Sequence, residues 1–273
     1  MIKLPKRKKE TNKGDYGHVF IIAGAPGFTG AAALCSQAAL LCGSGLATLG
    51  IAKGLNTILA RKLTEVMTKP LPETKSGSLS EKAFPQIMEF SKKADCVAIG
   101  PGLSRDPSTQ RLVRRLVVSL DKPIVLDADG LNALEGHTAL LKRARAPVVV
   151  TPHPGEMARL TKERVAKTFA NKYNVVCVLK GHRTVVARPV GKAYVNNTGN
   201  PGMAKGGTGD VLTGMIASFI GQGIGPFEAA SLGVYLHGLA GDLAAKEKGQ
   251  VSMLASDLLE KIPEAIRSLS KKR

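Results

Sequence analysis

A glycine-rich loop that leads into an apolar helix pattern carries the residues best suited to chemistry in this sequence. Residues 196–223 read NNTGNPGMAKGGTGDVLTGMIASFIGQG, with six glycines between Gly199 and Gly214. The apolar residues after Asp210 recur on one helix face, so we expect a helix to begin within 207–210. A helix start leaves backbone N–H groups unpaired and carries partial positive charge, and glycines let a ligand approach them closely. The loop therefore predicts an anion site, with phosphate as the expected anion. The residues of the expected helix face are Val211, Leu212, Met215, Ile216, Phe219 and Ile220.

Asp210 adds a carboxylate at this expected helix start. An aspartate there has an ordinary explanation, because Asp caps helices and interacts favourably with the helix dipole. The glycines on both sides of Thr208 and the upstream Lys205 favour a second interpretation, since they would bring a base, an anion-binding loop and a cation together. That combination suits phosphoryl transfer to a hydroxyl group.

The composition is that of a globular protein large enough for one α/β domain. The chain has 273 residues, of which 44% are apolar and 4% aromatic, with no Trp. The four cysteines stand in mostly apolar surroundings without a CxxC pair, so we expect buried thiols in a reducing compartment. The start of the chain lacks the apolar core of a secretory signal, and no apolar run reaches about 18 residues. We therefore expect a cytoplasmic protein that does not enter a membrane.

The net charge of +18 is concentrated in part at the chain ends. Residues 1–14 hold six Lys or Arg against one Glu, and the last three residues are all basic. We expect basic, solvated tails at about 1–13 and 270–273. No basic stretch is interleaved with aromatic residues, as single-strand binding would require, so nucleic acid is not an expected partner.

Short apolar runs alternate with helix patterns along the chain, and three closely spaced runs follow near residue 175. Strands are expected at 18–24, 46–52, 65–68, 95–100, 123–126 and 148–150, and three more within 175–197. Helices are expected at 29–43 with Thr29 as cap, from a Ser80 cap to about 90, at 107–119, from 155 or 156, at 226–248 and at 255–269. Repeated strand–helix units predict a mostly parallel central sheet with helices on both faces, and the last three strands predict hairpins.

Most glycine-rich or acidic loops follow the carboxyl end of an expected strand. In open parallel sheets the ligand crevice lies outside those ends, so we expect these loops to line one site. The loops are residues 24–30, 100–102, 127–132, 151–156 and 199–210. No linker divides the chain and no repeat occurs in it, so we expect a single domain over residues 1–273.

With these motifs assembled, the chain resembles the ADP/ATP-dependent NAD(P)H-hydrate dehydratase family, a branch of the ribokinase-like fold. The resemblance covers residues 14–242, most of the chain. GGTGDVLTG alone would indicate only a ribokinase-like protein, whereas TPHPGEM together with NNTGNPGMAKGGTGD is more specific. The other matching segments are GDYGHVFIIAGAPGFTGAA, CGSGLATL, AIGPGLS, VLDADGLNAL, VCVLKGHRT and YLHGLAGD.

The resemblance implies a three-layer α/β sandwich and a repair reaction. The S epimer of hydrated NADH or NADPH would be dehydrated at the expense of ADP or ATP with Mg²⁺. Asp210 would act as base on the ring hydroxyl, which would be phosphorylated transiently and then lost as phosphate. The resemblance also implies a homo-oligomer, often a tetramer, and a separate epimerase, because the epimerase domain often fused to this family is not seen in the sequence.

Carried over residue by residue, the resemblance assigns two sets of ligand contacts. The hydrated cofactor would contact Ala39, Gly102, His153 and Asp210. The nucleotide would contact Lys180, Gly181, His182, Arg183, Thr184, Gly206, Gly207, Thr208 and Gly209. No side chain is expected to ligate a metal directly, although Glu156 would reach Mg²⁺ through water. Asn197 and Asn200 would shape the loop, while His237 and Asp242 are expected to be structural.

Two other functions fit the same residues. The first is a ribokinase-like kinase of a small vitamin-precursor alcohol, of the hydroxymethylpyrimidine, thiazole or pyridoxal type, which would release a stable phosphate ester. The second is a basic binding protein that has the fold without the activity. Read without the resemblance, Gly102 could be a turn residue and Lys180 a strand-end charge.

Overall fold

The structure is a computed structural model that describes residues 7–271. The expected basic tails lie partly outside these residues. Within them, Arg7 donates a hydrogen bond to the carbonyl oxygen of Gly43 and stacks over the ring of Tyr16. At the other end the last helix continues to Lys271, two residues beyond the predicted 269.

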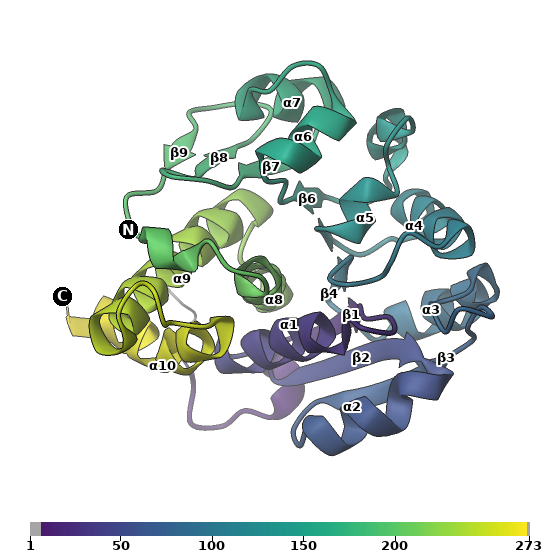
Figure 1. The fold of residues 1–273 in the computed structure, drawn as a ribbon, viewed down its shortest axis with the longest axis horizontal. Helices are drawn as coiled ribbons and strands as arrows, with labels where there is room; N and C mark the ends of the chain where they lie inside the picture. Colours follow the sequence, from purple (N-terminus) through teal and green to yellow (C-terminus); the bar gives the residue numbers. More distant parts are fainter. Residues whose placement is uncertain (1–6, 272–273) are drawn as a thin grey trace.

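In this part of the chain the strands form one nine-stranded sheet, in the order β3-β2-β1-β4-β5-β6-β7-β8-β9 (Figure 1). The strands are β1 (His18–Ile22), β2 (Leu46–Ala52), β3 (Met67–Leu71), β4 (Cys96–Ile99), β5 (Ile124–Leu126), β6 (Val148–Val150), β7 (Val176–Leu179), β8 (Val185–Ala187) and β9 (Tyr194–Val195). Strands β1 to β7 pair in parallel, and β8 and β9 add antiparallel pairs. The carboxyl ends of the parallel strands therefore lie along one edge.

Helices cover both faces of this sheet and make three layers (Figure 1). The α-helices are α1 (Thr29–Leu41), α2 (Asn56–Lys62), α3 (Phe84–Ser91), α4 (Pro107–Ser119), α5 (Asp129–Asn132), α6 (Pro154–Leu160), α7 (Ala166–Tyr173), α8 (Thr208–Gly221), α9 (Pro226–Lys248) and α10 (Ala255–Lys271). Short 3-10 helices are η1 (Lys13–Tyr16), η2 (Lys53–Leu55), η3 (Glu81–Ala83), η4 (Thr138–Arg143) and η5 (Pro201–Met203). Helices α1, α8, α9 and α10 pack on one face, and α3 to α7 pack on the other. The predicted α/β sandwich is confirmed.

Strand β1 illustrates why the sheet needs both layers. Val19 and Ile21 belong to the core beneath α1 and α8, whereas Phe20 and Ile22 belong to the core beneath α3 and α4. All four side chains are fully buried. Each contributes roughly 1.5–3 kcal/mol by leaving water. A strand buried on both faces appears in sequence as a continuous apolar run, as predicted for residues 18–24.

Helices α1 and α8 approach so closely that their contact requires a glycine. A Cβ atom added at Gly214 would lie 2.0 Å from the carbonyl oxygen of Cys35 on α1. The small α1 residues Ala38 and Ala39 belong to the same buried core as α8. This packing fixes the position of the first turn of α8, which contains Asp210.

Most predicted elements are confirmed, including the hairpins and the start of α8, and α4 and α9 have the predicted bounds. The predicted Thr29 cap is wrong, because Phe28 occupies the cap position without a side-chain hydrogen bond and Thr29 is the first helical residue. Strand β3 lies later than predicted and contains Pro70. Proline is tolerated here because β3 is an edge strand of the sheet. Helix α6 begins at Pro154, one residue before the predicted range.

The four cysteines, Cys35, Cys42, Cys96 and Cys177, are buried and free, which confirms the predicted buried thiols. Among residues 7–271, no helix is both long and apolar enough to cross a membrane.

Candidate active site

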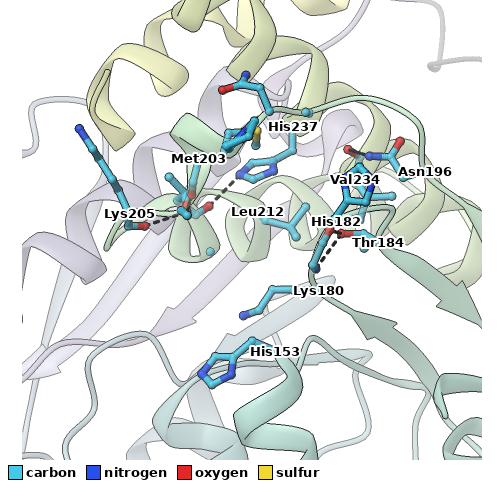
Figure 2. Close-up of a pocket in the computed structure, with 18 of the residues that line it drawn as sticks. His153, Lys180, His182, Thr184, Asn196, Met203, Lys205, Leu212, Val234 and His237 are labelled. Atoms are coloured by element: carbon cyan, nitrogen blue, oxygen red, sulfur yellow. Dashed lines mark hydrogen bonds between the residues drawn. The ribbon is translucent and has the colours of Figure 1, made fainter. Parts of the chain in front are cut away.

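Loops at the carboxyl edge of the sheet surround a cavity of about 950 Å³ (Figure 2). Its lining comes from residues 127–128, 153–154 and 180–184, from most of residues 196–210, and from Leu212, Val234, His237 and Gly238. Three of the five loops predicted to share a site therefore meet here. The loops at 24–30 and 100–102 do not line this cavity.

The loop before α8 is held by side-chain amides that reach neighbouring elements. Asn196 is buried and donates to the carbonyl oxygens of Thr198 at 3.0 Å and Val234 at 3.1 Å. Asn200 accepts from the N–H of Gly202 and donates to Asp242, as expected for a residue that shapes the loop. The same role predicted for Asn197 is wrong. Its side chain is exposed, and the neighbouring Asn196 makes the anchoring contacts.

The carboxylate of Asp242 also accepts from the N–H of Gly199 at 3.0 Å. His237 is buried, and its Nε2 atom lies 2.8 Å from the carbonyl oxygen of Thr208. Burial lowers the pKa of His237 to about 4, so its imidazole is neutral at physiological pH. Both residues thus make the structural contacts that were expected, although His237 also lines the cavity.

Helix α8 begins at the cavity without a capping side chain. Its cap residue is Gly207, which has a φ of +93° that side-chain-bearing residues rarely adopt. The Oγ1 atom of Thr208 donates back to Met203 and Lys205 and secures the turn. Because no side chain caps the helix within the described residues, its first N–H groups remain available to an anion.

Asp210 lies in this first turn and lines the cavity. Burial is the main cause that raises the pKa of Asp210 to about 7, and the negative charge of Asp127 adds to the increase. The ammonium group of Lys180 acts in the opposite direction and is outweighed. A carboxyl group that titrates near neutral pH has the proton affinity required of a general base.

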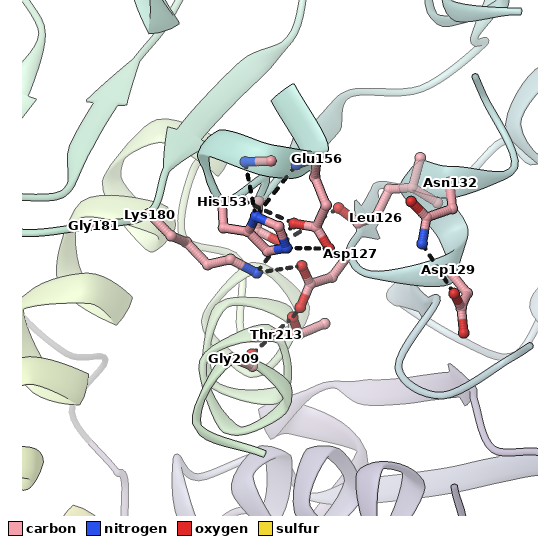
Figure 3. Close-up of polar contacts among 12 residues, drawn as sticks. Leu126, Asp127, Asp129, Asn132, His153, Glu156, Lys180, Gly181, Gly209 and Thr213 are labelled. Atoms are coloured by element: carbon pink, nitrogen blue, oxygen red, sulfur yellow. Dashed lines mark hydrogen bonds and ion pairs between the residues drawn. The ribbon is translucent and has the colours of Figure 1, made fainter. Parts of the chain in front are cut away.

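A polar network centred on the buried carboxylate of Asp127 joins three elements (Figure 3). The carboxylate of Asp127, 1% exposed, accepts from Lys180 Nζ at 2.7 Å and from Thr213 Oγ1 at 2.7 Å. Glu156 lies 3.8 Å from the same Nζ atom. Burial alone would lower the pKa of Lys180, but the two carboxylates outweigh it and the net change is upward. Lys180 is therefore a protonated cation.

Sequence reasoning did not single out Asp127, although its loop was expected at the site. The available signal was an aspartate that directly follows the apolar strand IVL. It also misplaced the nearby cation. Lys205 Nζ donates to the carbonyl oxygen of Val251 at 2.6 Å and points away from Lys180 (Figure 2). Lys180 supplies the positive charge near Asp210 instead.

The residues predicted to contact the nucleotide lie together in the cavity wall. Gly181 and Thr184 close a turn in which Thr184 Oγ1 donates to the Gly181 carbonyl oxygen at 3.0 Å. Arg183 adopts a φ of +56° in that turn. Both predicted segments, residues 180–184 and 206–209, line the cavity.

The residues predicted to contact the hydrated cofactor are not all brought together. His153 caps α6 through its Nδ1 atom, which accepts from Gly155 at 3.0 Å, and about half of its side chain is exposed. Gly102 lies beside the start of α1, because an added Cβ would meet Phe28 at 2.7 Å and Ala31 at 3.1 Å. The prediction for Ala39 is wrong, since it is fully buried in the core. The small α1 residue beside Gly102 is Ala31.

The comparisons with known proteins agree with this geometry. The family model described as NAD(P)H-hydrate dehydratase matches residues 19–264. The bifunctional NAD(P)H-hydrate repair enzyme of Moorella thermoacetica is 49% identical over 97% of this chain and 52% of its own length. The chain thus spans about half the length of this curated relative. The ADP-dependent (S)-NAD(P)H-hydrate dehydratase of Bacillus subtilis is 36% identical over 95% of this chain and 92% of its own.

Solved structures confirm the fold. A crystal structure of the Bacillus subtilis ADP/ATP-dependent NAD(P)H-hydrate dehydratase, co-crystallised with ATP and Mg²⁺, matches with a TM-score of 0.81 and 32% identity, covering 97% of this chain and 94% of the other. The ribokinase of Thermotoga maritima matches over 90% of this chain and 99% of its own, with a TM-score of 0.54 at 14% identity, a likeness of fold alone. The predicted ribokinase-like fold is confirmed. From its sequence and its fold together, this chain belongs to the NAD(P)H-hydrate dehydratase family.

Proposed function

We propose that this protein catalyses the ADP- or ATP-dependent dehydration of the S epimer of hydrated NADH or NADPH and so restores the reduced cofactor. The observation that carries the proposal is the placement of Asp210, with a pKa near 7, in the uncapped first turn of α8 at the cavity. Such a carboxylate can accept a proton from a hydroxyl group near neutral pH. Family membership supports the hydrate as the hydroxyl compound.

The reaction follows from that placement. Asp210 accepts the proton of the ring hydroxyl while the hydroxyl oxygen attacks the terminal phosphorus of the nucleotide. The leaving group is AMP when ADP is the donor, and ADP when ATP is the donor. Phosphate then departs from the ring carbon with the bonding electron pair. Loss of a proton from the adjacent ring carbon forms the double bond of the reduced nicotinamide. Phosphorylation assists this elimination because phosphate is a far better leaving group than hydroxide.

The nucleotide would occupy the cavity between residues 180–184 and the start of α8. Backbone N–H groups of residues 206–209 would stabilise negative charge on the transferring phosphoryl group. The ammonium group of Lys180 lies beside the start of α8, since an added Cβ at Gly209 would be only 3.3 Å from it. A cation and a helix start that converge at this distance suit a phosphate chain.

The hydrated cofactor would approach from the side of Gly102 and His153. Ser104, two residues after Gly102, donates its N–H to Asp129 at 2.9 Å, and the charge of Asp129 is among those that raise the pKa of Asp210. The Gly102 loop is thus linked to the neighbourhood of the base. We include Ala31 in this contact set in place of Ala39.

Mg²⁺ fits the donor chemistry of the site. In the described residues, no group of three His, Cys, Asp or Glu side chains could hold a metal ion, so phosphate and water oxygens would supply most ligands. The carboxylate of Glu156 would contact the ion through water. When bound, Mg²⁺ would neutralise charge on the transferring phosphoryl group.

We also propose that residues 1–273 form a single catalytic domain. The protein would act in the cytoplasm as a homo-oligomer, with a tetramer as the expected state. A separate epimerase would convert the R hydrate to the S form that this enzyme accepts. Neither nucleic acid nor a membrane is a proposed partner.

An assay with hydrated NADH tests the proposed function. With ADP or ATP and Mg²⁺, we expect the reduced-nicotinamide absorbance to return, with one phosphate released for each NADH recovered. Parallel reactions offer hydroxymethylpyrimidine, hydroxyethylthiazole and pyridoxal as phosphoryl acceptors. Recovery of NADH without turnover of these alcohols supports the proposal. Turnover of an alcohol to a stable phosphate ester, with no recovery of NADH, would establish the kinase alternative.

A further inference from the structure

The carboxylate of Asp127 is buried and hydrogen-bonded at both oxygen atoms, yet it has no step in the proposed reaction. It is 1% exposed, and each of its two oxygen atoms accepts a separate hydrogen bond of 2.7 Å. Oδ1 accepts from Lys180, just after strand β7, and Oδ2 accepts from Thr213 on α8. The side chain extends from the end of β5 and therefore links three elements at one point.

Each of these links leads to a group that the reaction uses. Thr213 lies one helical turn after Asp210, and its Oγ1 atom also contacts the carbonyl oxygen of Gly209 at 3.2 Å. Lys180 lines the cavity, with its Nζ atom 3.3 Å from an added Cβ at Gly209. Asp127 thus sets the position of the first turn of α8 relative to the ammonium group of Lys180. Ionised oxygen acceptors give hydrogen bonds about twice as strong as neutral ones, so both links are firm.

We propose that Asp127 is a positioning residue that fixes Lys180 and the first turn of α8 relative to each other. The expected changes in kcat rest on the proposed function. The contacts of Asp127 and the effect of its charge on Asp210 do not depend on the substrate. Asp127 does not touch the reacting atoms in this scheme. It acts through Thr213, Lys180 and its own charge.

The charge balance around Asp210 explains the electrostatic part. Among the described residues, the charged groups that act on Asp210 are Asp127 and Asp129 after β5, Glu156 on α6 and Lys180 after β7. The thiol of Cys35 on α1 is also close to Asp210, and His237 on α9 contacts Thr208 in the same helical turn. Asp127 is the first carboxylate among the causes that raise the pKa of Asp210, after burial. Its ion pair with Lys180 also keeps the ammonium group turned toward Asp127. Removing the Asp127 charge would therefore lower the pKa of Asp210 in two ways.

The test compares Asp127→Asn and Thr213→Val with two matched controls. Asp95→Asn removes a carboxylate that accepts a hydrogen bond from the N–H of His18 at the opposite edge of the sheet. Thr138→Val removes a buried hydroxyl that donates to the carbonyl oxygens of Leu134 and Leu160. The first readout is the NMR titration of the Asp210 carboxyl carbon, identified by its loss in Asp210→Asn. This readout requires no substrate, so it separates this inference from the proposed function.

We expect Asp127→Asn to move the Asp210 titration to lower pH by about one pH unit. The acidic limb of the pH profile of kcat/KM should move to lower pH by the same amount. We also expect kcat at the plateau to fall about 100-fold, because small misplacements of reacting groups have effects of this size. Thr213→Val should lower kcat about tenfold and leave the KM for ADP unchanged. Both controls should retain the wild-type titration and kcat.

An unchanged Asp210 titration together with kcat within twofold of wild type in folded Asp127→Asn would overturn the inference, since a merely structural residue would alter stability alone. If Asp127→Asn does not fold, Thr213→Val decides, and kcat within twofold of wild type in that variant overturns the inference equally. An enzyme that fails on the hydrate but shows the expected NMR shift contradicts the proposed function and supports the positioning role.

Discussion

Asp210 combines two properties that oppose each other in a folded protein. Its position in the first helical turn favours a negative charge, while its burial among other carboxylates disfavours it. The outcome is a pKa near 7, against an ordinary value of 3.8. The fold therefore loses stability by keeping this carboxyl group buried, a compromise common at active sites.

This compromise predicts that Asp210→Asn stabilises the protein in a pH-dependent manner. Because the folded-state pKa is raised, the unfolded chain ionises first as pH increases, and wild type loses stability between about pH 4 and pH 7. The loss corresponds to on the order of 2–4 kcal/mol above pH 7. We expect Asp210→Asn to melt higher than wild type at pH 8 by roughly 5 to 10 °C, with the difference vanishing near pH 4.

Thermal unfolding followed by circular dichroism at several pH values measures this effect. Asp257→Asn is the control, because Asp257 lies in the first turn of α10, where it accepts from the N–H of Leu254 at 2.7 Å. That variant should lose stability at pH 8. A melting temperature for Asp210→Asn at or below wild type at pH 8 would contradict the buried, raised-pKa description of Asp210.

The sequence predicted Asp210 and the loop around it, and the resemblance named Lys180, but neither singled out Asp127. Asp127 and Lys180 are 53 positions apart and meet because strands β5 and β7 flank β6. The spacing of residues within a short segment does not predict such a contact. Lys205 is close to Asp210 in sequence and was the predicted cation, yet its Nζ atom donates to the carbonyl oxygen of Val251.

At the scale of elements, the position of Asp210 depends on how α8 packs against α1. Gly214 faces the backbone of α1 so closely that a Cβ atom would lie 2.0 Å from the Cys35 carbonyl oxygen. Backbone atoms cannot move aside as a flexible side chain can, so one helix must shift. The contact therefore couples global stability to the placement of Asp210.

We expect Gly214→Ala to destabilise the protein by about 3 kcal/mol or more, since overpacking a rigid contact has effects of this size. Its kcat should fall as well, because the first turn of α8 moves with the helix. Gly30→Ala is the matched control on α1, where no atom lies within 4 Å of an added Cβ. Alanine is the better helix former, so Gly30→Ala should be as stable as wild type or more so.

Denaturant unfolding measures both variants. Equal stability of Gly214→Ala and wild type would show that the α1–α8 contact is not as tight as described.

Most elements were predictable because they depend on local pattern, as α4 and α9 show. The errors at the α1 cap and at β3 arose where no side-chain cap formed and where an edge position tolerated Pro70.

At the scale of the whole molecule, the parallel sheet determines which loops can share a site. The order of strands places the ends of β5, β6 and β7 side by side, so Asp127, His153 and Lys180 converge although they are distant in sequence. The antiparallel pair of β7 and β8 then places residues 180–184 at the cavity wall. The strand–loop–helix pattern predicted in outline that these loops converge. It did not distinguish the three predicted loops that line the cavity from the two that do not.

In the proposed reaction, Asp210 accepts the proton when the phosphoryl group passes from nucleotide to hydrated cofactor. The most direct test is a single-turnover reaction of hydrated NADH with ADP and Mg²⁺ at pH 8, comparing wild type with Asp210→Asn and following AMP, phosphate and NADH together. We expect wild type to form the three products in equal amounts. Asp210→Asn should bind ADP with unchanged affinity and form all three at least about 100-fold more slowly. Formation of NADH by Asp210→Asn at a rate within tenfold of wild type would contradict the account.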